Sequence, residues 1–151
     1  MAGLVTMSAA DREAVLTATI ARWASSGCAA FPCGLEVWRY ACEASGAEVT
    51  ALPPHQSRRQ MSALLKREGG LVAYAGKLMT SLGWRAGNMA YAPRRGDVGV
   101  VNLGGMGLTC AICLGESQYP GIGNWMAKGD GHVLTAAAPR LAIWRLPCPR
   151  P

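Results

Sequence analysis

The chain has 151 residues, half of them hydrophobic, and a formal net charge of +6 at pH 7. That length suits one domain with one hydrophobic core, so we expect a single domain over residues 1–151, with a loose arm (1–7) and a loose tail (147–151). No apolar run approaches the roughly 20 residues that cross a bilayer, and no basic region followed by a hydrophobic one opens the chain, which predicts neither a membrane span nor an export signal.

The positive charge is scattered along the chain. Adjacent arginines occur at Arg58-Arg59 and Arg94-Arg95, and the single Phe and four Tyr do not interleave with a basic run. Nucleic-acid binders concentrate their cations and interleave aromatic residues with them. We therefore expect no nucleic-acid partner, and instead a solvated basic surface or a patch that meets an acidic protein.

The first half of the chain predicts helices. Ser8 and Asp11 have the spacing of a capping box at the start of the first helix, and Leu16, Ile20 and Trp23 repeat at helical intervals. Glycines follow the apolar stretches where helices end. The expected helices are residues 8–25, 34–45, 57–67 and 71–82.

From Trp84 the pattern changes to short extended segments between turns. Residues 98–103 and 108–114 predict two strands of a hairpin around the turn at 104–107. Later strands are expected at 124–127, 132–135 and 142–146, completing a small antiparallel sheet. Helices first and strands afterwards predict an α+β fold. The tryptophans mostly fall at inward positions, and Asp97 is expected to cap backbone N–H groups of its own turn.

Residues 31–46 are expected to form a short loop that brings Cys33 to the start of the helix at 34–45, with Gly46 as the stop at its end. Unpaired backbone N–H groups and the positive end of the helix dipole favour a thiolate there, which is the placement of a nucleophile. Such a thiol needs a base, most often histidine. His55 lies in a proline-containing connector and is expected to be exposed without a role, whereas His132 lies on a later strand, either near the Cys33 helix or at the sheet surface.

The chain has six cysteines, and with no export signal they are expected to be free thiols. Cys42 falls on the side of its helix opposite Cys33. Cys110 and Cys113 have the spacing of a metal or redox motif, but residues three apart on a strand point to opposite faces, which favours buried structural thiols and no cofactor. The alternative is a metal or iron–sulfur site drawn from Cys28, Cys33, Cys110, Cys113 and Cys148.

The order of these features resembles the papain-like cell-wall cysteine peptidases of the NlpC type, and most closely the small branch encoded among phage tail genes. The resemblance covers roughly residues 10–146. It rests on Cys33 at a helix start, Gly46 at that helix's end, the turn 94–98 leading into a strand, the strand ending at 113–115, and the terminal segment 142–146.

The resemblance implies a papain-like, NlpC-type fold in which Cys33 is the nucleophile and a histidine opening the second hairpin strand is the base. Pro32 precedes the cysteine where the family typically has Asp or Asn, and Thr109 occupies the expected base position. A threonine hydroxyl does not accept a proton at neutral pH as an imidazole does. The catalytic pair that the resemblance implies therefore lacks its general base.

The resemblance and the cysteines together lead us to expect one of three functions. The first is an inactive structural or assembly component of the virion tail tip, made in the host cytoplasm and docking onto tail hub and baseplate proteins. The second is an active cysteine peptidase or amidase that cleaves peptidoglycan during genome entry, with Cys33 attacking the amide and His132 as base. The third is the cysteine-ligated metal or iron–sulfur module.

Overall fold

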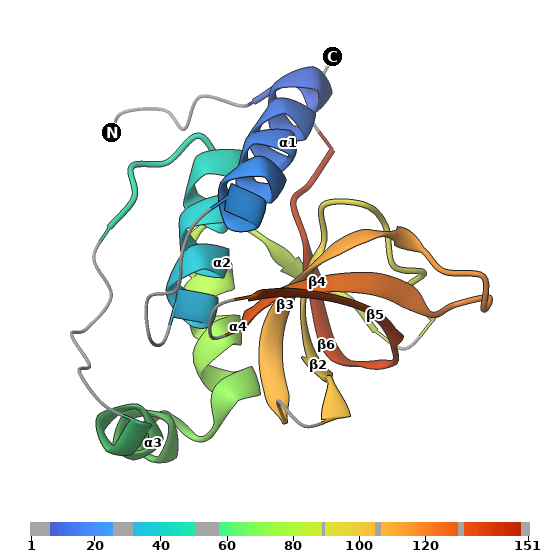
Figure 1. The fold of residues 1–151 in the computed structure, drawn as a ribbon. Helices are drawn as coiled ribbons and strands as arrows, with labels where there is room; N and C mark the ends of the chain where they lie inside the picture. The colour runs from blue at the N-terminus through green and yellow to red at the C-terminus, as the bar shows by residue number, and fades with distance from the viewer. Residues whose placement is uncertain are drawn as a thin grey trace.

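The computed structural model describes residues 7–25, 32–50, 58–88, 90–104, 107–129 and 132–148. Within these residues four helices precede six strands. Figure 1 shows α1, α2 and α4 gathered along one side of a strongly curved sheet, with α3 standing away from it. The predicted α+β order of helices first and strands afterwards is confirmed.

The helices begin and end close to the predicted positions. They are α1 (Ala9–Ser25), α2 (Pro32–Ala44), α3 (Arg58–Glu68) and α4 (Leu71–Ser81). The predicted cap of α1 is present, because the Asp11 amide donates to Ser8 Oγ at 3.1 Å and the Ser8 hydroxyl donates to Asp11 Oδ2 at 2.8 Å. Gly46, at φ 70°, ends α2 as expected. The one shift of note is that α2 starts two residues earlier than predicted.

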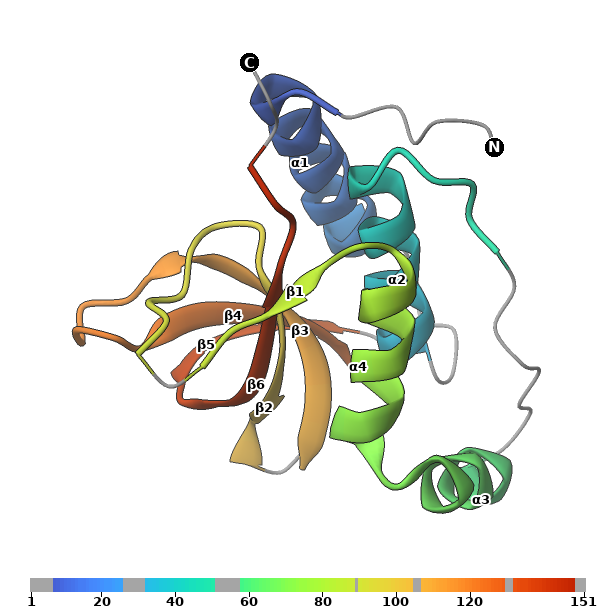
Figure 2. The same ribbon diagram turned by 180° about the vertical axis from the view of Figure 1, so that it is seen from behind.

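The strands form one antiparallel sheet in the order β1-β6-β2-β3-β4-β5. The predicted hairpin is present as β2 and β3, and the later strands run longer than expected. The sequence pattern missed β1, a two-residue strand that pairs with the end of β6. In Figure 2 α4 leads directly into β1. The bounds are β1 (Arg85–Ala86), β2 (Val98–Asn102), β3 (Leu108–Glu116), β4 (Gly123–Gly129), β5 (His132–Ala138) and β6 (Arg140–Arg145).

The sheet has a hydrophobic cluster on each face. On the face that packs against the helices, which we call the helix side, the buried strand residues are Val98, Val100, Ile112, Met126 and Trp144. On the opposite face, the far side, they are Val101, Ala111, Cys113, Trp125, Ala127, Ala138 and Ile143. Successive residues of a strand point to opposite faces of the sheet, so the place of a residue along its strand decides which of the two clusters its side chain joins.

The far-side cluster is built around Trp125. Its indole N–H donates to the Ala138 carbonyl at 3.0 Å, and the side chain is completely buried. A Cβ at Gly99 would lie 2.7 Å from the Trp125 ring, so a glycine is required where this ring crosses β2. All five tryptophans are buried, which confirms the predicted core role.

None of the helices in the described ranges is long and apolar enough to cross a membrane.

Candidate functional site

Cys33 lies in the first turn of α2, but its side chain is outside the described part of the structure. The helix packs against α1 and against β3 and β4. Glu36, one turn further on, accepts a hydrogen bond from the Trp23 indole at 3.1 Å and pairs with Arg22 at 3.3 Å. These two contacts fix the start of α2 beside the end of α1.

Thr109, the residue at the expected base position, lies on the far side of the sheet. It pairs in register with Val101, a member of the far-side cluster, and it is 4 % exposed. Its hydroxyl donates to the Cys110 carbonyl at 3.4 Å. The neighbouring residue on β3 that packs toward the helices is Cys110. Thr109 is therefore turned away from the layer that contains the Cys33 helix.

His132 is the first residue of β5 and pairs with Gly129 of β4. The next pair along the ladder, Val133 with Lys128, belongs to the helix side, because Val133 packs on that cluster and Lys128 contacts α1. The imidazole of His132 and the whole of His55 lie outside the described residues.

Lys128 is a buried cation that the sequence pattern did not single out. It is 3 % exposed, and its Nζ donates to the Trp23 carbonyl in the last turn of α1 at 3.1 Å. A lysine just past a predicted strand at 124–127 resembles a turn residue. Because β4 continues to Gly129, the lysine instead points into the helix side, where the end of α1 supplies an acceptor.

The cysteines are distributed over both faces of the sheet. Cys110 packs on the helix side and Cys113 in the far-side cluster, as the strand spacing predicted. Cys42 is buried and Cys148 exposed. Within the described residues no three His, Cys, Asp or Glu side chains form a group that could hold a metal. Of the remaining metal candidates, Cys28 and the Cys33 side chain lie outside the described residues.

Burial also changes the chemistry of these thiols. It raises the pKa of Cys113 to about 11 and also raises the pKa of Cys42. Both thiols are therefore neutral at physiological pH, and a neutral thiol is a poor nucleophile and metal ligand.

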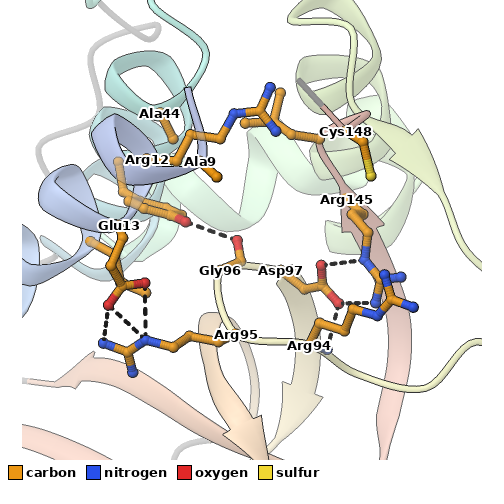
Figure 3. Close-up of a pocket in the computed structure, with 13 residues that line it drawn as sticks. Ala9, Arg12, Glu13, Ala44, Arg94, Arg95, Gly96, Asp97, Arg145 and Cys148 are labelled. Carbon is orange, nitrogen blue, oxygen red and sulfur yellow. Dashed lines mark hydrogen bonds and ion pairs between the residues drawn. The ribbon is translucent and has the colours of Figure 1, made fainter. Parts of the chain in front are cut away.

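The turn at 94–97 forms the base of a pocket of about 210 Å³ between α1, α2 and the end of β6 (Figure 3). Asp97, only 2 % exposed, accepts a hydrogen bond from the Arg94 amide at 2.8 Å, which confirms its predicted capping role. The Tyr40 hydroxyl donates to the Gly96 carbonyl at 2.8 Å. Burial is the main cause that raises the pKa of Tyr40, so its hydroxyl stays a donor.

Four arginines and two carboxylates line this pocket, which we call the arginine pocket: Arg12, Arg94, Arg95, Arg145, Glu13 and Asp97. Arg145 binds Asp97 through two hydrogen bonds, and the Arg145 guanidinium lies 3.9 Å from the centre of the Tyr91 ring. Arg95 pairs with Glu13 at 2.8 Å. The bonds to these carboxylates raise the pKa of both arginines, so both remain charged.

The fold and these sites define an α+β protein with a helix-borne cysteine and an arginine-lined pocket. No protein-family model matches the chain, and neither a curated protein nor a solved structure matches it.

Proposed function

We propose that this chain is a structural component of a phage tail tip, with an NlpC-type fold that has lost its catalytic pair and docks onto tail hub and baseplate proteins. The arrangement of elements supports the fold part of the proposal. A cysteine-bearing helix packs on β3 and β4, and the turn at 94–97 leads directly into β2. Folds of enzymes are often reused for binding after their chemistry is lost.

The observation on which the proposal rests is the position of Thr109. A nucleophilic cysteine requires a base within hydrogen-bond reach. At the strand position where the resemblance implies that base, the residue is a threonine, and it is buried on the far side with Val101 and Ala111. The helix-side residue beside it is Cys110, a thiol rather than an imidazole.

The edge of the sheet supports a docking role. β5 is the terminal strand of the sheet, and its seven residues include no Lys, Arg, Asp or Glu. Thr135, Ala136 and Ala137 are exposed along it. Uncharged edge strands readily accept a strand from another protein, and natural monomers usually block them with charges or proline.

The catalytic part of the proposal is tested by hydrolysis of purified peptidoglycan and of a stem-peptide substrate. The intact protein is compared with Cys33→Ala and His132→Ala. We expect no turnover in any of the three. Turnover by the intact protein that is lost in both variants would establish the peptidase alternative and overturn the proposal.

The structural part is tested by mass spectrometry of purified virions. We expect the chain to be present in the particle, and its absence would count against a tail-tip role. A lysine on the open edge, in Ala136→Lys, should reduce incorporation into particles, because a charged side chain opposes strand pairing. Ala63→Lys, at an exposed position on α3, is the matched control and should be incorporated normally.

A further inference from the structure

The arginine pocket contains more positive than negative charge. Its two carboxylates are each already engaged, Glu13 by Arg95 and Asp97 by Arg145. Among the described residues no carboxylate pairs with Arg12 or Arg94. The described residues that line the pocket therefore carry an excess of two positive charges, one on Arg12 of α1 and one on Arg94 of the turn at 94–97.

Arg12 is held in place without being neutralised. Its terminal nitrogen donates to the Pro147 carbonyl at 2.7 Å, while its Nε is buried with no hydrogen-bond partner in the described structure. A buried donor without an acceptor is unfavourable, and more so when it is charged. Arg12 lies on the α1 side of the pocket and Arg94 on the turn opposite, beside Arg145 (Figure 3).

The surroundings of the two arginines are fixed by contacts within the protein. The turn is tied to α2 by Tyr40 and to β3 by the Gly96 amide, which donates to the Cys113 carbonyl at 2.8 Å. Arg145 is held by Asp97 and by the Tyr91 ring. A site whose walls are already ordered loses little conformational entropy when a ligand enters.

From this geometry we propose that the arginine pocket binds a small divalent oxyanion, of the phosphate or dicarboxylate type. Guanidinium groups recognise such oxygens through charge-assisted, paired hydrogen bonds. Two charges on the ligand match the two arginines that lack a carboxylate partner, and the volume of about 210 Å³ accommodates a group of this size. The site requires neither Cys33 nor a role in a phage tail.

The test is a titration of the full-length protein followed by amide NMR shifts at constant ionic strength. The probes are inorganic phosphate and succinate, at about pH 8, where phosphate is mainly dianionic, and acetate serves as the monovalent comparison. We expect saturable shifts at the turn 94–97 and in the first turn of α1 with at least one divalent probe. The tighter of the two probes identifies the ligand class.

Arg94→Gln is the decisive variant, because no side-chain partner of Arg94 is present among the described residues to be lost. It should weaken binding by at least about fivefold, the effect of removing one charge-assisted hydrogen bond. Arg12→Gln should weaken it similarly. Arg59→Gln, on the exposed surface of α3, makes the same charge change away from the pocket and should leave affinity unchanged.

Three results would overturn the proposal. These are no saturable shift at the pocket with either divalent probe, equal affinity in Arg94→Gln and the intact protein, or acetate binding as tightly as both divalent probes.

Discussion

Arg145 binds the nearly buried carboxylate of Asp97 with both branches of its guanidinium, Nε to Oδ1 at 2.8 Å and a terminal nitrogen to Oδ2 at 2.7 Å. The two residues are 48 positions apart in the chain. Their pairing joins the turn before β2 to the last residue of β6. It also engages the Asp97 carboxylate in the turn that forms the base of the arginine pocket.

Arg145→Met should destabilise the protein by about 2 to 3 kcal/mol, because it leaves the Asp97 carboxylate buried without its cationic partner. Urea denaturation measures the change in the free energy of unfolding. Arg67→Met, at an exposed position on α3, should change it by less than about 0.5 kcal/mol. Equal effects of the two substitutions would show that the pair contributes little.

Gly99→Ala and Gly76→Ala should change stability in opposite directions. At Gly99 the added methyl group would lie 2.7 Å from the Trp125 ring and 2.9 Å from the Ala142 carbonyl. Such overpacking costs about 1 to 3 kcal/mol. At Gly76, inside α4, the nearest atom is an ordinary 3.5 Å away on Trp144, so alanine should stabilise by about 0.5 to 1 kcal/mol through its helix propensity. Thermal unfolding of both variants measures the contrast.

Tyr40→Phe should cost about 1 kcal/mol, because the Gly96 carbonyl loses the hydroxyl that donates to it at 2.8 Å. The matched control is Tyr119→Phe, where the tyrosine is 56 % exposed and the effect should be within about 0.5 kcal/mol. Chemical denaturation of the two variants checks this. A neutral Tyr40→Phe would mean that the turn at 94–97 is held by its other contacts.

The stability of the protein should decrease at alkaline pH in part through Cys113. Burial raises the pKa of this thiol from 9.0 to about 11 in the folded state. Between these values the unfolded state loses the proton and the folded state keeps it, so the free energy of unfolding falls as pH rises through this window. Below it both states are protonated, and the contribution is absent.

Urea denaturation across that pH range tests the Cys113 contribution. Cys113→Ala should make the decline with rising pH shallower, because the variant has no buried thiol at this position to titrate. Cys148→Ala, which removes an exposed thiol, should leave the slope of the intact protein unchanged. An unchanged slope in Cys113→Ala would assign the decline to other groups.

Local features of the sequence predicted much of the fold. The cap formed by Ser8 and Asp11, the glycine that ends α2 and the hairpin of β2 and β3 are each determined by residues within a few positions of one another. Helical and strand periodicity likewise placed the buried tryptophans. Such features are readable because their hydrogen bonds and steric requirements act over a single turn of chain.

The tertiary structure decided the features that concern function. Sheet register placed Thr109 on the far side, and the greater length of β4 buried Lys128 against α1. The arginine pocket is assembled from α1, α2, the turn at 94–97 and the end of β6. Local periodicity contains no information about which distant segments meet, because long-range pairing is selected by the packing of whole elements. The position of Cys33 at a predicted helix start therefore suggested a nucleophile, whereas the packing turned Thr109, at the expected base position, away from that helix and assembled a charged pocket elsewhere.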